Sequence, residues 1–217
     1  MSLVSIVMFV MAIYLMNKMF LGIKPGTKKV NTDVSKFRDQ AAQWKEQLVP
    51  WNEEEMELFS LAQSNQVSRR GFGRSFEGVV QSIYHEPMLY YHYKEYPASK
   101  RNAIIFAQTA KYEMVYRIRA KNTQVFVNES FLGTIEQDGT LHHPEQDQVY
   151  GRVMRQDLYR RPIFIDNQEM GAVVLPMSKS NVNPRAFDLD EKMEEGQQVF
   201  FMVLGIHEVI LYLTRVS

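Results

Sequence analysis

The sequence predicts a mainly β protein: an antiparallel barrel or sandwich with a buried apolar C-terminal helix, preceded by an N-terminal transmembrane helix and a helical connector. Three observations lead to this prediction. The N-terminal residues are apolar and almost uncharged, residues 72–176 alternate short β-type runs with turn residues, and residues 199–213 are apolar on all sides. They divide the 217 residues into an anchor (1–23), a connector (24–71) and a strand-rich domain (72–217).

The N-terminal segment has the length of a membrane-spanning helix. No charged side chain occurs from Leu3 to Met16, and the apolar character resumes after Lys18 and continues to Ile23. About 20 apolar residues cross a bilayer, and a lysine near the end of the span can extend its side chain to the headgroups. A cleaved secretory signal is the alternative. Because no Lys or Arg precedes the apolar run and no A-x-A-like site follows it, we expect a retained anchor.

The charges that flank the predicted span indicate its orientation. None of the residues before it is basic, whereas several that follow it are. Positive charge stays on the cytoplasmic side, so the strand-rich domain is expected in the cytoplasm. Lysines close to the span can also contact anionic headgroups, each contributing about 1 kcal/mol, or can serve only to set the topology. The expected membrane-surface contacts are Lys18, Lys24, Lys28 and Lys29.

The connector begins with a helical pattern over 33–49, which Pro50 ends. Its apolar residues recur at spacings of three and four, which is typical of a helical seam. Two heptads are too few for an independent coiled coil. The seam is therefore expected to pack on the chain's own domain, to contact a protein partner or a second copy in a homodimer, or to lie on the membrane surface. It comprises Val34, Phe37, Ala41, Trp44 and Leu48.

A second helix is predicted immediately after Pro50. Asn52 is a suitable N-cap, and Glu55 stands three residues later, as in a capping box. This helix is expected to run to about residue 62. The polar and basic stretch 66–73 is expected to be the loop that enters the strand-rich domain.

The strand-rich domain is predicted from runs of aromatic and β-branched residues. No long helical period interrupts them, which favours an antiparallel barrel or sandwich over a doubly wound sheet. Tyr91 and Tyr93 would share one face of their strand, where they could line a ligand groove or cover a sheet that is buried on one side. The predicted strands are 75–84, 88–93, 103–109, 111–120, 124–128, 132–137, 149–155, 162–166 and 171–176.

One internal repeat stands out. Residues 125–135 align without gaps on residues 163–173, and each copy is a strand, an Asn or Asp turn, an apolar residue, a glycine and a second strand. Asn128 and Asp166 tolerate turn geometry, and the glycines permit a bulge or a close backbone approach. We expect two similar hairpins in one sheet system, although chance recurrence of a common hairpin pattern is the alternative.

The layout resembles the tubby-like superfamily, which includes the phospholipid scramblases and the LURP-one-related proteins. The resemblance covers residues 72–213 and is carried by the hairpins 125–135 and 163–173 and by the apolar segment 199–213. It implies a closed barrel around the C-terminal helix and an interaction with lipids or anions. The sequence departs from the family in three respects: there is no cysteine-rich acylated stretch, the anchor is N-terminal, and no phosphoinositide-binding lysine–arginine motif can be matched.

The composition argues against several functional classes. Lys and Arg number 25 and so do Asp and Glu, so no basic excess indicates a nucleic-acid partner. The absence of cysteine excludes disulfides, thiolate catalysis and cysteine-ligated metals. The sequence contains no phosphate-binding loop, dinucleotide fingerprint or nucleophile elbow. We therefore predict neither a cofactor nor a metal, and nothing marks the chain as an enzyme.

The histidines provide the two candidate catalytic sites. His207 and Glu208 lie inside the apolar C-terminal segment, but Leu211 occupies the position where a zinc-protease helix requires its second histidine. A buried pair with hydrogen-bond partners in the barrel interior is the simpler interpretation. The turn from His142 to Asp147 carries metal-capable atoms but lacks a third fixed ligand.

We therefore expect a non-enzymatic, membrane-tethered binding or scaffold domain, with a lipid- or anion-interacting barrel as its specific form. A membrane-bound enzyme that uses His207 and Glu208 or the His142–Asp147 turn is the first alternative. A subunit of a larger envelope complex, in contact through the seam of residues 34–48, is the second.

Overall fold

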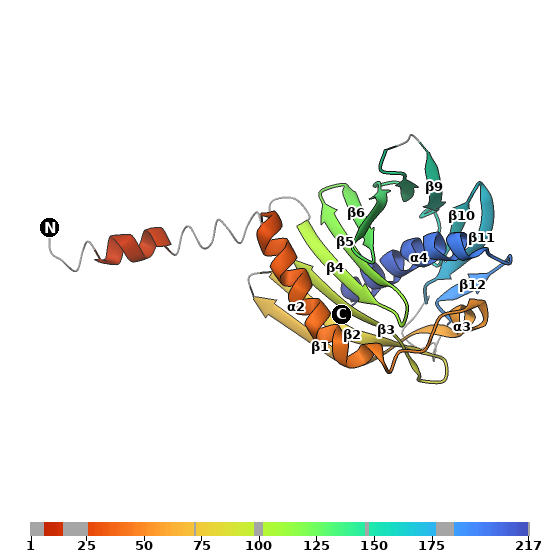
Figure 1. The fold of residues 1–217 in the computed structure, drawn as a ribbon, viewed down its shortest axis with the longest axis horizontal. Helices are drawn as coiled ribbons and strands as arrows, with labels where there is room; N and C mark the ends of the chain where they lie inside the picture. The colour runs from red at the N-terminus through yellow and green to blue at the C-terminus, as the bar shows by residue number, and fades with distance from the viewer. Residues whose placement is uncertain are drawn as a thin grey trace.

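The computed structural model describes residues 7–14, 26–71, 73–97, 102–145, 148–176 and 185–216. Twelve antiparallel strands form one sheet in sequence order, and the sheet curls into a nearly closed barrel (Figure 1). The strands are β1 (Phe59–Gly71), β2 (Gly73–Ser82), β3 (Pro87–Glu95), β4 (Asn102–Gln108), β5 (Glu113–Arg119), β6 (Asn122–Val127), β7 (Ser130–Ile135), β8 (Thr140–His142), β9 (Val149–Val153), β10 (Arg160–Ile165), β11 (Gln168–Val174) and β12 (Phe187–Leu189).

The first and last parts of the sheet approach each other at one point. Ser60 forms an isolated antiparallel bridge with Arg185, and the backbone N–H of Ala186 donates a hydrogen bond of 2.8 Å to the carbonyl of Phe59. A sheet that nearly closes in this way presents little open edge. The mainly antiparallel β class is confirmed, and of the two predicted architectures the structure shows the barrel.

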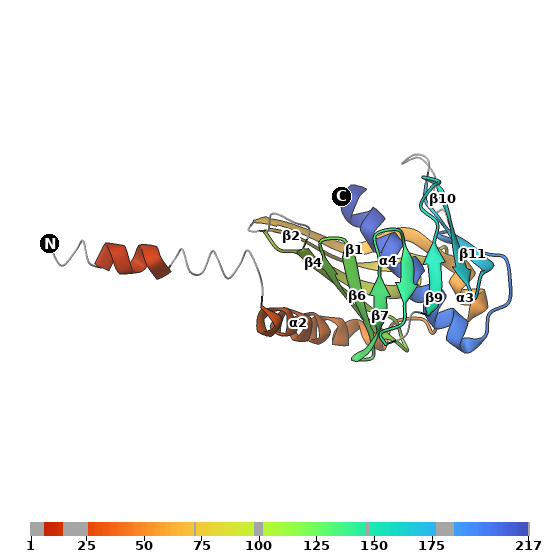
Figure 2. The same cartoon turned by 90° about the horizontal axis from the view of Figure 1, so that it is seen from above.

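The C-terminal helix α4 (Glu195–Val216) fills the barrel interior, as expected for a segment that is apolar on all sides (Figure 2). Every side chain from Phe201 to Leu211 is buried. Gly205 allows close packing, because a Cβ at this position would lie 2.8 Å from the ring of Phe187. Among the described helices, α4 is the one long and apolar enough to cross a membrane, but most of it lies inside the barrel.

Helix α2 (Thr27–Lys45) covers the outer face of the barrel over β3 to β5. It begins six residues earlier than predicted, with Gly26 as its N-cap, because the buried side chain of Val30 extends the seam by one turn. The seam packs on the chain's own barrel in a second core, against Val79, Tyr90, Tyr96, Ile104, Phe106 and Val115.

The segment after Pro50 differs from the prediction. The Asn52 side chain accepts a hydrogen bond of 2.8 Å from the Glu55 N–H, as an N-cap does, but helix α3 (Glu53–Leu58) ends after six residues. Strand β1 follows at once, where the sequence predicts more helix and then a loop. The polar residues of this segment do not by themselves favour a strand. The segment is a strand because its backbone pairs with β2 along the length of β1. The barrel therefore begins at Phe59 rather than at residue 72.

The two repeated hairpins are confirmed in detail. In β6–β7 the register shifts after the pair Val125–Gly133, and in β10–β11 it shifts after the equivalent pair Ile163–Gly171. Both turn residues of each hairpin have positive φ, as in the turns preferred by tight hairpins: Asn128 and Glu129, then Asp166 and Asn167. A Cβ on either glycine would lie within 2.4 Å of a carbonyl oxygen on the neighbouring strand, so both glycines permit close backbone approach.

The predicted membrane span is described only over residues 7–14, which are helical. Their large apolar side chains are 49% to 68% exposed. The rest of the predicted span and its flanking Lys18 and Lys24 lie outside the described residues.

Candidate functional site

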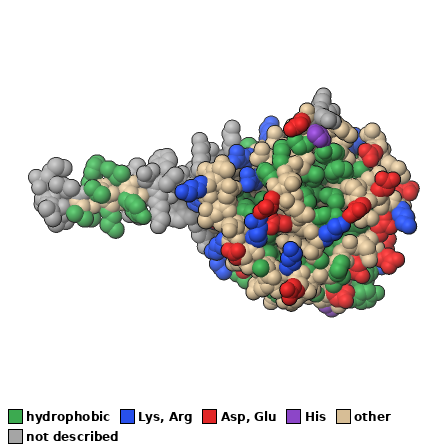
Figure 3. Space-filling view, viewed as in Figure 1, with side chains coloured by type: hydrophobic (Ala, Val, Ile, Leu, Met, Phe, Trp, Pro, Cys, Tyr) green, Lys and Arg blue, Asp and Glu red, His purple; other side chains and the backbone are tan. Residues whose placement is uncertain are grey.

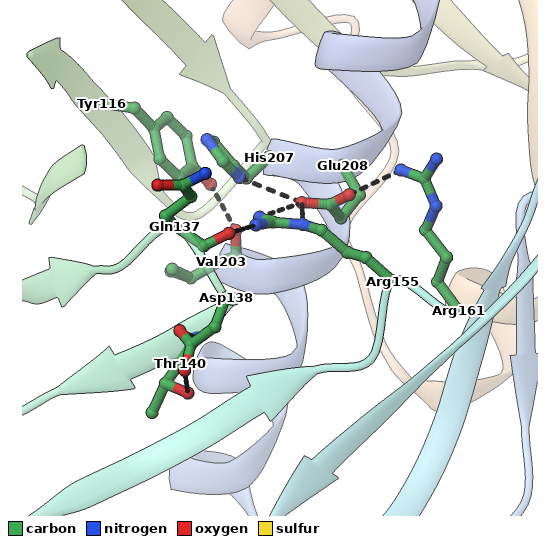
Figure 4. Close-up of polar contacts among 9 residues, drawn as sticks. All are labelled: Tyr116, Gln137, Asp138, Thr140, Arg155, Arg161, Val203, His207 and Glu208. Atoms are coloured by element: carbon green, nitrogen blue, oxygen red, sulfur yellow. Dashed lines mark hydrogen bonds and ion pairs between the residues drawn. The ribbon is translucent and has the colours of Figure 1, made fainter. Parts of the chain in front are cut away.

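The most distinctive polar feature of the barrel interior is a charge cluster on α4. Glu208 lies on this helix with its side chain 1% exposed, although its neighbours on the helix other than His207 are largely apolar. Two arginines reach it from the barrel wall: Arg155 follows β9, and Arg161 belongs to β10 (Figure 4). Their side chains are 28% and 13% exposed, so the cluster lies near one mouth of the barrel rather than at its centre.

The hydrogen bonds of the cluster use both carboxylate oxygens of Glu208. Arg155 donates to Oε1 from Nε at 3.1 Å and from a terminal nitrogen at 2.6 Å, and its other terminal nitrogen donates to the carbonyl of Gln137 at 2.7 Å. Arg161 donates to Oε2 at 2.6 Å. His207 Nδ1 lies 3.3 Å from Oε1. Charge-assisted hydrogen bonds of this length are among the stronger ones in proteins.

These contacts determine the ionisation of Glu208. Burial opposes the charged form and by itself would raise the pKa of the carboxyl group. The hydrogen bonds and charges of His207 and Arg155 act in the opposite direction and hold the pKa of Glu208 well below its usual value. The carboxylate is therefore ionised at neutral pH, as a buried partner of guanidinium groups must be.

A tyrosine packs beside this cluster. The hydroxyl of Tyr116 donates a hydrogen bond of 2.9 Å to the carbonyl of Val203, and its ring centroid lies 5.4 Å from that of His207. Complete burial raises the pKa of Tyr116 well above its usual value, so the phenol stays neutral. Both contacts tie α4 to strand β5 and set the orientation of the helix in the barrel.

The arrangement joins α4 to the barrel and is poorly suited to catalysis. A general acid or base needs a pKa near the working pH and access to the proton that it transfers. Glu208 has neither, since guanidinium groups occupy both of its oxygens. Within the described residues, no group of three or more His, Asp or Glu side chains is placed to hold a metal ion.

The other predicted site residues lie apart from this cluster. Tyr91 and Tyr93 are buried in the main core, where the Tyr91 hydroxyl donates a hydrogen bond of 2.5 Å to Gln63 Oε1. They therefore line no open groove in this structure. In the second catalytic candidate, His142 Nε2 lies 4.0 Å from Glu136 Oε1. Asp147 lies outside the described residues.

A second buried polar group lies beneath α2. His92 stacks on Phe37 with 3.7 Å between ring centroids, shares a hydrogen bond of 2.8 Å with the Ser75 hydroxyl, and lies 3.2 Å from Glu77. Burial and the nearby charge of Lys94 lower the pKa of His92 to about 3. His92 is therefore neutral at physiological pH and acts as part of the packing between α2 and the sheet.

Sequence reasoning identified Glu208 but missed its partners. A glutamate inside an apolar helix requires buried cationic partners, which is a usable signal. The chain has many arginines, however, and only the strand register shows that Arg155 and Arg161 reach the same carboxylate.

Ion pairs join α2 firmly to the barrel. Asp33 accepts from the Lys94 ammonium at 2.7 Å and from the Tyr96 hydroxyl at 2.5 Å. Arg38 donates two hydrogen bonds, of 2.6 and 2.7 Å, to the carboxylate of Glu113. Of the seam residues, Val34, Phe37, Ala41 and Leu48 are buried and Trp44 is partly buried. A partner could reach the seam only by displacing α2 from the barrel.

Comparison with known proteins gives no relative from which a function could be transferred. The chain matches no family model, no curated protein and no solved structure.

Proposed function

We propose that this chain is a membrane-tethered, non-enzymatic binding or scaffold domain whose barrel is held on the cytoplasmic side. The observation that carries the proposal is the contrast between its two apolar helical segments. The apolar side chains of α4 are enclosed by the barrel, whereas those of residues 7–14 are exposed. An exposed apolar helix is stable in a lipid environment, because lipid removes its surface from water.

The filled interior favours a role for the outer surface. Helix α4 occupies the space that larger barrels use for ligands, and the interior charge cluster uses Glu208 as a cross-link. A domain of this kind acts by presenting its surface. The tubby-like superfamily, which the chain resembles, has a closed barrel around an apolar C-terminal helix. This resemblance supports the proposal that the outer surface interacts with lipids or anions.

The attachment of α2 supports the scaffold part of the proposal. The N-cap of the helix, Gly26, stands three positions after the end of the predicted span, and the helix is fixed to the barrel by its buried seam and by the Asp33 and Arg38 ion pairs. A tether at the predicted span would therefore hold the barrel close to the membrane. The basic residues that follow the span favour a cytoplasmic barrel.

Membrane fractionation of the full-length chain tests the tether. Val10→Arg places a charge within the apolar segment, which costs about 3 kcal/mol in the middle of a membrane helix. We expect the wild-type chain to remain in membranes after washes with high salt and alkaline carbonate, and the variant to be released in part. Leu158→Arg is the matched control, because Leu158 is an exposed apolar residue of the barrel surface, at 69%. If the wild-type chain is soluble after the salt wash, the tether is refuted.

A further inference from the structure

The barrel carries opposite charges at its two ends. The end where α2 begins is rich in lysine and arginine, and the opposite end is rich in aspartate and glutamate (Figure 3). We call the first set the basic rim, which is formed by the start of α2 and by the ends of the β1–β2, β3–β4 and β5–β6 strand pairs. Among the described residues it comprises Lys28, Lys29, Arg69, Arg74, Lys94, Arg117, Arg119 and Lys121. The acidic end is formed by α3 and the segment around β12 and comprises Glu53, Glu54, Glu55, Glu57, Asp188, Asp190, Glu191, Glu194 and Glu195.

Side-chain contacts fix the basic rim to the first turns of α2. Lys94 is paired with Asp33, Arg117 donates a hydrogen bond of 2.9 Å to Asn31, and the Lys29 ammonium lies 5.9 Å from the ring centroid of Tyr96. The tip of β1–β2 and the start of α2 lie at the same end of the molecule in both ribbon views (Figures 1 and 2). The rim and the start of α2 therefore move as one body.

Acidic side chains neutralise only part of the rim. Asp33 pairs with Lys94, and Glu95 pairs with Arg74 at 2.8 Å. Glu136 and Asp138 lie beside Lys121. In the described part of the rim, these four acidic groups accompany the eight basic ones. At the other end, the nine acidic residues are accompanied by Lys111, Arg160, Arg185 and Lys192.

The tether places the basic rim close to the membrane. If the span ends at Ile23, three residue steps lead to Gly26, a distance of at most about 10 Å in an extended chain. This is close to the screening length of about 8 Å at physiological ionic strength. Helix α2, with 19 residues, is itself about 28 Å long, which is more than three screening lengths. A rim at the start of α2 is therefore near enough to the predicted span to meet the field of the headgroups.

We propose that the basic rim docks on anionic phospholipid headgroups, so that the barrel stands on the membrane with its acidic end directed away from it. This inference rests on the proposed tether. The inference adds to the tether two features: the face of the barrel that meets the membrane, and the chemistry of the lipid that this face contacts. Repulsion between the acidic end and the same headgroups disfavours the inverted orientation.

Depth-dependent fluorescence quenching of the full-length chain in vesicles tests the orientation. The chain has no cysteine, so a single cysteine can carry a dye at either end: Asn122→Cys in the rim or Gln47→Cys beyond the far end of α2, both exposed neutral positions. The vesicles are of phosphatidylcholine alone or contain one-third phosphatidylserine, with a headgroup-bound quencher. We expect stronger quenching at residue 122 with phosphatidylserine, reversed by high salt, and little change at residue 47.

Charge neutralisation provides the second measurement. A headgroup contact of about 1 kcal/mol corresponds to about a fivefold change in the docking equilibrium for each basic residue. Arg69→Gln with Arg119→Gln should therefore reduce the docked fraction relative to the undocked one by at least about tenfold. The matched control, Lys45→Gln with Lys192→Gln, removes two exposed lysines that lie outside the rim and should leave quenching unchanged.

The outcomes separate this inference from the tether. Co-sedimentation with phosphatidylcholine vesicles after a salt wash reports the tether alone. The chain could co-sediment while the two labels are quenched equally, or while quenching does not depend on phosphatidylserine and salt. Either result would overturn docking of the rim and leave the tether intact. If the rim label responds to added polyuridylic acid but not to phosphatidylserine, the rim is a nucleic-acid surface and the inference also fails. A chain that does not co-sediment refutes the tether and, with it, the docking geometry.

Discussion

Replacing Glu208 by Gln should destabilise the barrel by about 3 kcal/mol or more. The substitution preserves shape but removes the charge to which Arg155 and Arg161 donate three hydrogen bonds. Removing one partner of a buried ion pair typically costs 3–5 kcal/mol, because the remaining charge stays buried without compensation. The loss should lie toward the lower end of that range, since the amide oxygen can still accept a hydrogen bond and Arg155 is partly exposed.

The effect should depend on pH with a definite sign. The folded-state pKa of Glu208 lies below its usual value of 4.5, so its contribution to stability is fully present above that pH. It is lost as the pH falls toward the folded-state pKa. The difference in unfolding free energy between wild type and Glu208→Gln should therefore be constant near neutrality and shrink below pH 4.5.

Urea unfolding of the chain from Gly26 onward measures both quantities. Every buried residue of the described core lies at or after Val30, and Trp51, packed 4.9 Å from Phe59 between ring centroids, reports on the barrel by fluorescence. Glu191→Gln is the control, because Glu191 is exposed. A loss below about 1 kcal/mol for Glu208→Gln, or a difference that does not change with pH, would refute the assignment of the cluster as a buried cross-link.

Other substitutions test the packing of the same fragment. The fragment 26–217 should be soluble and folded, as judged by circular dichroism and sedimentation, and persistent membrane binding after a salt wash would reveal a second anchor. Phe201→Ala should cost about 3–5 kcal/mol in urea melts, and a small loss would mean that α4 is peripheral to the core. Gly205→Ala should cost about 1–3 kcal/mol, because its Cβ would lie 2.8 Å from the Phe187 ring, and no change would show that the contact relaxes freely. His92 should remain neutral down to about pH 3 in NMR titrations. Because its pKa is lowered on folding, the free energy of unfolding should fall as the pH drops below 6.5. A titration midpoint near 6.5 would contradict the burial of His92.

Local patterns predicted several elements well. The turn residues and glycines of the repeat placed both hairpins, including their matching bulges, because positive φ and close backbone approach restrict the residue types at those positions. The N-cap at Asn52 was also predicted correctly. Its helix was predicted too long, since the segment from Phe59 onward forms a strand through pairing with β2 rather than through its own propensity.

Elements with a local or compositional cause could be predicted from the sequence. These are the hairpin turns, the helical seam of residues 34–48 and an apolar C-terminal helix that had to be enclosed. Which surfaces meet became clear only from the folded chain: the seam packs on the outer wall of the barrel, Tyr91 and Tyr93 face the core, and Arg155 and Arg161 reach Glu208. A local pattern fixes the backbone conformation and the polarity of a face. The partner of that face depends instead on strand register and barrel closure, because these are set by contacts between residues far apart in the chain.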